Sequence, residues 1–313
     1  MKGLELAERY YEEVGRLMLA DECWADLNHI AAGLVGEGSE CFGFDDEISR
    51  DHDWGPGFCI WLTAADFERL GAKLQAAYDA LPKTHAGFGP RRDTGTQKRT
   101  GVFEINDFYR RFVRFDHVPA TLAEWRALPE TFLATATNGK VFTDPVGEFT
   151  AFREGLLAFY PRDVQLKKLA ARCFTAGQAG QYNFKRSVDR GELVAAQVGL
   201  SQFIEAVTSA AYLLNKTYRP FYKWMHRGLT GLPVLGRELH KLLDRLCGQP
   251  GQSAPEALAG QAHVIEEISA LLIGRLRLQG LTDSPSDFLL DHAYSVQHRI
   301  ENEALRSMPV MLE

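Results

Sequence analysis

Two aspartates separated by one residue, Asp51 and Asp53, have the spacing in this sequence that best suits metal chemistry. The run from residue 51 to residue 62 is rich in aromatic and branched side chains, which predicts a β-strand. Alternate side chains of a strand face the same way, so both carboxylates would lie on one face and His52 on the other. Paired carboxylates are hard oxygen ligands that suit Mg²⁺. The pattern therefore predicts a site for divalent cations that orient a triphosphate and neutralise its charge.

A glycine-rich turn, Gly36-Glu37-Gly38-Ser39, comes before these aspartates, and residues 40–50 separate the two features. Because Gly38 has no Cβ, the backbone there can approach a phosphate closely. Ser39 can offer its N–H and its hydroxyl group from the N-terminus of a helix. We therefore predict that Gly38 and Ser39 contact the phosphates of a nucleotide.

The order and spacing of Gly38-Ser39 and Asp51-His52-Asp53 resemble the signature of the DNA-polymerase-β-like nucleotidyltransferase superfamily. The wider stretch GEGSECFGFDDEISRDHDWGPGF is similar to one bacterial family of that superfamily, the DUF4037 proteins, and this resemblance runs the length of the chain. His52 departs from the apolar middle residue that is usual in the superfamily. The resemblance implies that Asp51 and Asp53 bind Mg²⁺ in a two-metal site. It also implies that a third carboxylate on a neighbouring strand completes the site, often as general base.

Glu104 is the residue that best fits this third carboxylate, as a metal ligand and catalytic group. It lies in Val102-Phe103-Glu104-Ile105, where an acidic residue with apolar neighbours occupies a predicted strand. Asp107 is the first alternative, and Asp144, which follows another predicted strand, is the second.

The elements that must position these residues change character near residue 150. Before that point, apolar patterns predict helices and short strands, namely helices at 4–30 and 64–81 and strands at 31–35, 51–62, 102–105 and 140–143. After it the strand patterns fade, and helical periods predict helices at 193–214, 234–247, 255–279 and 285–306. The sequence therefore predicts an α+β protein, in which a mixed-sheet nucleotidyltransferase domain at residues 1–150 precedes an all-helical substrate-binding domain at residues 151–313.

Cations and aromatic residues gather after the helix predicted at 193–214, in the stretch from Leu214 to Trp224. The stretch resembles the helical substrate domain of small-molecule nucleotidyltransferases of the kanamycin and lincosamide type. By that resemblance, Lys216, Tyr218 and Lys223 contact the triphosphate or the base across a cleft from the carboxylates. A triphosphate keeps excess negative charge beyond two Mg²⁺ ions, so lysines supplied by a second domain suit it.

The composition of the chain limits which substrates and which cellular location we expect. The net charge of −6 over 313 residues argues against nucleic acid as the substrate and favours a small molecule. The five cysteines have neither zinc-site nor redox-motif spacing, which indicates reduced thiols. The N-terminus turns acidic within a few residues, and polar side chains interrupt the most apolar helix. We therefore expect a cytoplasmic protein with neither a secretory signal nor a membrane span.

These patterns together predict an Mg²⁺-dependent nucleotidyltransferase that moves a nucleoside monophosphate, AMP from ATP, to a hydroxyl group of a small molecule or a protein. The alternative is a catalytically inactive nucleotide-binding or regulatory module with the same fold. The third carboxylate distinguishes the two, because transfer needs it and binding does not.

Overall fold

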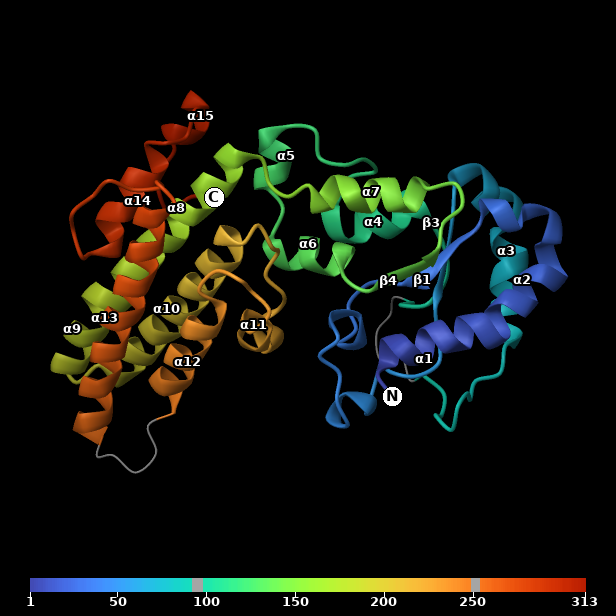
Figure 1. The fold of residues 1–313 in the computed structure, drawn as a ribbon, viewed down its shortest axis with the longest axis horizontal. Coiled ribbons are helices and arrows are strands. Elements are labelled where there is room, and N and C mark those ends of the chain that lie inside the picture. The colour runs from blue at the N-terminus through green and yellow to red at the C-terminus, as the bar shows by residue number, and fades with distance from the viewer. Residues whose placement is uncertain (92–97, 249–253) are drawn as a thin grey trace. The chain divides into compact units, whose positions relative to one another are not determined.

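The computed structural model describes residues 1–91, 98–248 and 254–313, which form two compact units. Unit 1 comprises Met1–Ala120 and Leu128–Ala158, and unit 2 comprises Thr121–Ala127 and Phe159–Glu313. The predicted boundary at residue 150 falls inside helix α7 (Glu148–Leu157), and helix α5 (Leu122–Arg126) joins unit 2. The α+β class is confirmed, since the strands of the described chain lie in unit 1 and unit 2 is helical (Figure 1).

The described residues of unit 1 form one mixed four-stranded sheet. Its strands are β1 (Ala31–Leu34), β2 (Cys59–Leu62), β3 (Gly101–Glu104) and β4 (Lys140–Thr143), in the spatial order β3-β2-β1-β4. Strand β1 runs antiparallel to β2 and to β4, and β2 runs parallel to β3. Consequently β2, β3 and β4 all begin at the end of the sheet where β1 ends. We call this the turn end, because the glycine-rich turn follows β1 there, and the other the opposite end.

Helices cover both faces of this sheet. The helices of unit 1 are α1 (Gly3–Tyr10), α2 (Arg16–Cys23), α3 (Ala64–Ala80), α4 (Ile105–Val113), α6 (Glu130–Thr137) and α7. On one face, Ile60 and Leu62 pack in a buried core with residues of α1, α2 and α3. On the other face, the ring of Trp61 stacks on Phe149 of α7 with centroids 3.7 Å apart and meets Phe108 of α4 edge-on. Strand alternation thus divides β2 between two cores.

The predicted strand at 51–62 is wrong over residues 51–58, because only Cys59–Leu62 forms β2. Asp53 has φ +52° and Gly55 has φ +141°, and neither angle is compatible with a strand of L-residues. Pro56 adds a residue without a backbone donor. By contrast, helix α3 begins where the sequence predicts, with the Thr63 hydroxyl accepting a hydrogen bond from the Asp66 N–H at 3.2 Å.

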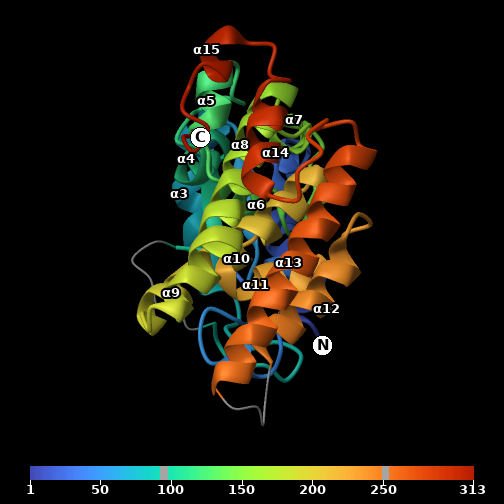
Figure 2. The same ribbon diagram turned by 90° about the vertical axis from the view of Figure 1, so that its left-hand side faces the viewer.

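Unit 2 packs its helices around a buried apolar core (Figure 1, Figure 2). Its helices besides α5 are α8 (Arg162–Ala176), α9 (Lys185–Asp189), α10 (Leu193–Leu214), α11 (Tyr222–Leu229), α12 (Gly236–Cys247), α13 (Ala254–Leu278), α14 (Leu289–Gln297) and α15 (Glu303–Arg306). The single helix predicted at 285–306 is wrong, because α14 and α15 are separate. Among the described residues, no helix combines the length and apolar character that crossing a membrane requires.

A fully buried lysine ties the C-terminal segment to α8. The Nζ of Lys167 donates hydrogen bonds of 2.8 Å to the side-chain oxygen of Gln297 and to the carbonyl oxygen of Pro309. Burial, reinforced by the charge of Arg126, lowers the pKa of Lys167 to about 8. Between pH 8 and the ordinary pKa of lysine, the unfolded chain therefore holds more protons than the folded chain, so stability rises with pH.

We expect this titration to be visible against Lys167→Met, which removes the charge and keeps the length of the side chain. From pH 7 to pH 10, the unfolding free energy of the wild type should increase by about 2 kcal/mol relative to that of the variant. Urea denaturation of both proteins at each pH measures the difference. A difference independent of pH would contradict the lowered pKa.

Candidate functional site

The glycine-rich turn leaves the end of β1 in a conformation that the neighbouring chain holds. Gly36 has φ +137°, in the region that favours glycine. Its N–H donates to the side-chain oxygen of Asn138 at 2.9 Å, and its carbonyl oxygen accepts from the side-chain nitrogen of Asn138 at 2.7 Å. Since Asn138 precedes β4, the turn is fastened to two neighbouring strands at the turn end of the sheet.

Gly38 is required by packing. A Cβ at this position would lie 2.3 Å from a carboxylate oxygen of Glu40. That carboxylate is buried and pairs with the buried guanidinium of Arg91 at 2.9 Å. The absence of a side chain at Gly38 therefore makes room for an internal ion pair, which is a different reason from the close phosphate approach predicted from the sequence.

Ser39 begins a 3₁₀ turn, Glu40–Phe42, in place of the helix predicted there. A turn of three residues lacks the aligned peptide dipoles that make a long helix attractive to anions. Within the described part of the chain, the Ser39 hydroxyl makes no hydrogen bond, so it is available to a ligand.

Asp51 and Asp53 differ in environment and do not share a strand face. The side chain of Asp51 is 64% exposed and pairs with the neighbouring His52 at 2.6 Å. Asp53 is only 5% exposed, and its carboxylate pairs with the guanidinium of Arg99 at 3.1 Å. The Nε of the same guanidinium lies 3.6 Å from the carboxylate of Glu37 in the glycine-rich turn. Arg99 therefore brings the turn and Asp53 together at the turn end of the sheet.

Glu104 does not join this group. Strand β3 runs parallel to β2, and Glu104 lies beside Leu62 at the opposite end of the sheet. Its carboxylate accepts hydrogen bonds from the N–H groups of Asn106 (3.0 Å) and Asp107 (2.7 Å), so it caps helix α4. The prediction that Glu104 lies in a strand is correct. The prediction that it lies near Asp51 and Asp53 is wrong, because those residues are at the turn end of the sheet.

The alternative carboxylates also lie at the opposite end of the sheet. Asp144 follows β4 and accepts hydrogen bonds from the N–H groups of Gly147 (3.0 Å) and Thr150 (2.8 Å), so it caps α7. Asp107 lies in the first turn of α4 and pairs with Arg110. None of the acidic residues predicted as the third carboxylate therefore approaches Asp53.

A cavity of about 10 Å³, with room for one water molecule, lies between the glycine-rich turn and helix α4. Its walls include Arg91, Arg99 and Arg111 as well as Gly36 and Gly38. The guanidinium of Arg111 lies 5.5 to 5.7 Å from the ring centres of Phe103, Phe108 and Phe112. Its buried Nε has no hydrogen-bond partner in the part of the chain that the structure describes. Arg91 and Arg99 are already paired with carboxylates, so an anion in this cavity would be received mainly by Arg111.

The thiol of Cys41 borders the same cavity, in a buried environment. Burial, together with the charge of Glu40, raises the pKa of Cys41 well above its usual range, so the thiol stays protonated. The donors for a cation here are therefore carboxylate oxygens. Asp53 and Glu37 fit Mg²⁺ in chemistry, because both are hard oxygen ligands gathered around one guanidinium.

The residues predicted to contact a nucleotide from the helical domain lie in unit 2. Helix α10 ends at Leu214, and Lys216 follows it with φ +49°. Tyr218 is buried, with its ring stacked on Phe159 at 4.8 Å, so it offers little surface to a nucleotide. Lys223 lies in the first turn of α11, with its Nζ 5.7 Å from the ring centre of Trp224.

The sequence did contain signals for the groups that were missed. Arg99 belongs to a basic loop at 84–100 whose residues 92–97 lie outside the described part of the chain. Arg111 lies within an aromatic pattern of α4 that runs from Phe108 to Phe112. This pattern indicated a buried helix face beside a cation. Glu37 is part of the glycine-rich turn that the sequence predicts, so its carboxylate could have been considered as a ligand. For the pairing of Glu40 with Arg91, the sequence gives no local signal, since 51 positions separate them.

Comparisons with known proteins complete this description. Residues 125–225 match the family described as "Domain of unknown function (DUF4037)", which confirms the predicted resemblance over this range. The stretch at residues 36–58 lies outside the match. A solved "nucleotidyltransferase-like protein from Exiguobacterium sibiricum 255-15" is similar with a TM-score of 0.37 and 8% identity, over 89% of this chain and 81% of that chain. No curated protein matches the chain.

Proposed function

We propose that this chain is an Mg²⁺-dependent nucleotidyltransferase that moves AMP from ATP to a hydroxyl group of a small molecule or a protein. One observation carries the proposal, which is that Arg99 holds Glu37 of the glycine-rich turn and the buried Asp53 at the same end of the sheet. A glycine-rich turn beside convergent carboxylates would suit a metal–triphosphate complex.

Asp53 and Asp51 would hold Mg²⁺, with Glu37 in place of Glu104 as the third carboxylate. Asp51 is available, because its pair with His52 is exposed and an exposed ion pair holds a side chain weakly. Glu37 has an exposed carboxylate close to Asp53, so it can also accept the proton of the acceptor hydroxyl. Bound Mg²⁺ would supply charge neutralisation for the triphosphate.

Arg99 would exchange partners when the nucleotide binds. The present cavity has room for about one water molecule, so a triphosphate enters only if a side chain in the wall moves. Arg99 leaves the carboxylates and pairs with phosphate oxygens, for which a guanidinium is well shaped. Arg111 contributes a buried N–H that has no hydrogen-bond partner among the described residues, and Ser39 contributes a hydroxyl.

A nucleotide-binding module without transfer is the second candidate. The observation that favours it is the position of Glu104, Asp107 and Asp144, which all lie at the opposite end of the sheet. Such a module would keep the arginines and the turn but lack a group that activates the acceptor.

Titration calorimetry with ATP, in Mg²⁺ and in excess chelator, tests the site. Labelled ATP carrying ³²P at the α-phosphate, incubated with the chain and with separated small-molecule and protein fractions of a cell extract, tests transfer. We expect Mg²⁺-dependent binding, a labelled acceptor and release of pyrophosphate. Binding without label in any fraction would favour the second candidate. If ATP fails to bind in Mg²⁺, both candidates are wrong.

A further inference from the structure

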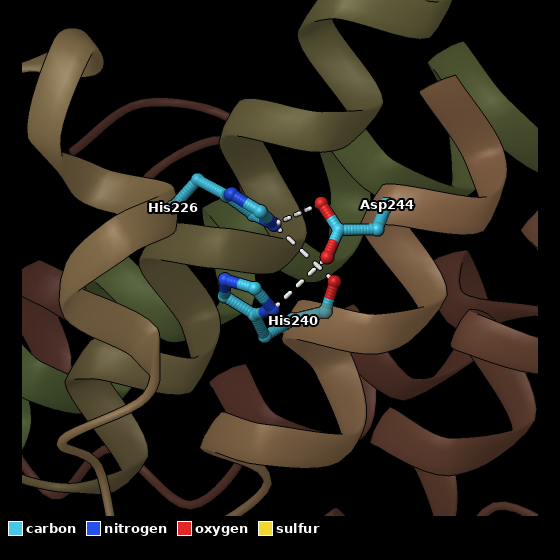
Figure 3. A group of neighbouring side chains, drawn as sticks. All are labelled: His226, His240 and Asp244. Atoms are coloured by element: carbon cyan, nitrogen blue, oxygen red, sulfur yellow. Dashed lines mark hydrogen bonds and ion pairs between the residues drawn. The ribbon is translucent and has the colours of Figure 1, made fainter. Parts of the chain in front are cut away.

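Two neighbouring helices of unit 2 bring two histidines and an aspartate together on one surface (Figure 3). His226 lies in the last turn of α11. His240 and Asp244 lie four positions apart on α12, so their side chains share one face of that helix. The chain between the two helices, residues 230–235, is short enough to keep them adjacent.

The distances match those between ligands of one metal ion. The Nε2 of His226 lies 3.4 Å from Oδ1 of Asp244, and the Nδ1 of His240 lies 3.2 Å from Oδ2 of Asp244. One ligand atom from each residue falls within 4.8 Å of the others. In a tetrahedral zinc site with bonds of about 2.0–2.1 Å, neighbouring ligand atoms are about 3.3–3.4 Å apart. The two nitrogen–oxygen separations, each to a different oxygen of Asp244, are therefore close to those of a loaded site.

The imidazole rings face one carboxylate, and because a bound ion lies in the plane of each imidazole, the stacked rings must turn apart when both bind it. They stack with centroids 4.0 Å apart and an angle of 18° between their planes, and their nitrogens point toward the same carboxylate (Figure 3). The Nε2 of His226 also contacts the carbonyl oxygen of His240 at 3.2 Å, a contact that metal binding would replace. The side chains of His226, His240 and Asp244 are 38%, 26% and 59% exposed, so an ion and its water ligand can reach them.

We propose that His226, His240 and Asp244 bind a divalent transition-metal ion, for which Zn²⁺ is the best fit. Two imidazole nitrogens and one carboxylate oxygen suit zinc, cobalt, nickel and copper, whereas Mg²⁺ prefers oxygen ligands alone. A fourth position remains for water. The bound ion fastens α11 to α12 and thereby stabilises unit 2. This site is separate from the Mg²⁺ site proposed in unit 1 and stands without it.

Titration calorimetry with ZnCl₂ tests the proposal on the untagged, metal-free chain. Cys247→Ser serves as the background, because an exposed thiol binds zinc by itself. We expect one ion per chain, and a melting temperature that rises by about 5 °C when free zinc exceeds its dissociation constant a hundredfold. Asp244→Asn, which keeps the shape of the side chain, should weaken binding at least about tenfold. His226→Ala combined with His240→Ala should remove it.

His263→Ala is the matched control. His263 lies four positions before Glu267 on α13, at 3.1 Å, so it forms the same kind of helical histidine–carboxylate pair without a second imidazole. We expect unchanged zinc affinity in this variant. Titration of the wild type with MgCl₂ should give only the heat that Asp53→Asn abolishes. Wild-type zinc affinity in Asp244→Asn would overturn the proposal, as would an equal loss in His263→Ala. Zinc-dependent dimerisation in gel filtration would overturn the assignment of all ligands to one chain.

Discussion

Replacing Asp53 with asparagine should lower the rate of Mg²⁺-dependent AMP transfer by about 10²- to 10³-fold. Asp53 is the buried carboxylate of the proposed site, so its charge contributes more to holding Mg²⁺ than an exposed charge would. Asparagine adopts positive φ at least as readily as aspartate, so the backbone at φ +52° is preserved. The loss would therefore report on the missing charge.

Glu37→Gln and Glu104→Gln separate the proposed site from the one predicted from the sequence. Glu37→Gln should slow transfer strongly, since it removes the carboxylate that shares Arg99 with Asp53. Glu104→Gln should keep transfer within about threefold and lower stability by about 1 kcal/mol, because this side chain caps α4. Release of pyrophosphate measures transfer in each variant. Full activity in Asp53→Asn would refute the site, and a selective loss in Glu104→Gln would refute the role of Glu37.

Replacing Glu40 with glutamine should lower the free energy of unfolding by about 3–5 kcal/mol, the usual effect of breaking a buried ion pair from one side. Glu40 is 2% exposed and the side chain of Arg91 is 7% exposed, with 2.9 Å between them. The variant leaves the guanidinium with less negative charge in a site that water hardly reaches.

Urea denaturation followed by circular dichroism measures this loss. Glu12→Gln is the matched control, because its partner Arg16 lies at 2.7 Å in a pair whose side chains are about half exposed. That variant should cost less than about 1 kcal/mol. Equal losses in the two variants would show that burial does not govern the strength of the pair between Glu40 and Arg91.

Much of the local structure was predictable from residue patterns. Helix α3 follows a capping threonine and an apolar period, and α10 shows one long apolar stripe. The prediction of a strand at 51–62 is wrong over residues 51–58 because it rested on a local pattern alone. Aromatic and branched residues predicted extended chain, but Asp53 and Gly55 adopt positive φ because the segment turns back to bury its aspartate against Arg99.

The candidate site was predicted in part, for a related reason. The glycine-rich turn and the candidate role of Asp53 came from motif spacing, which depends on neighbours in the chain. The choice of Glu104 required knowing which end of β3 faces the turn. Hydrophobic patterns are the same for parallel and antiparallel strands of this length, so they carry no information about that direction.

The amino-acid sequence by itself determined the α+β class, the glycine-rich turn after the first strand and the carboxylates that follow it. It also determined the resemblance that the match at residues 125–225 confirms. The tertiary structure alone decided that Asp53 meets Arg99, that Glu40 meets Arg91, and that His226 meets Asp244. Helix periods and caps act within a few residues, whereas these pairs join segments that strand order and helix packing bring together from distant positions. Chemistry that depends on such pairs is therefore visible only in the folded chain.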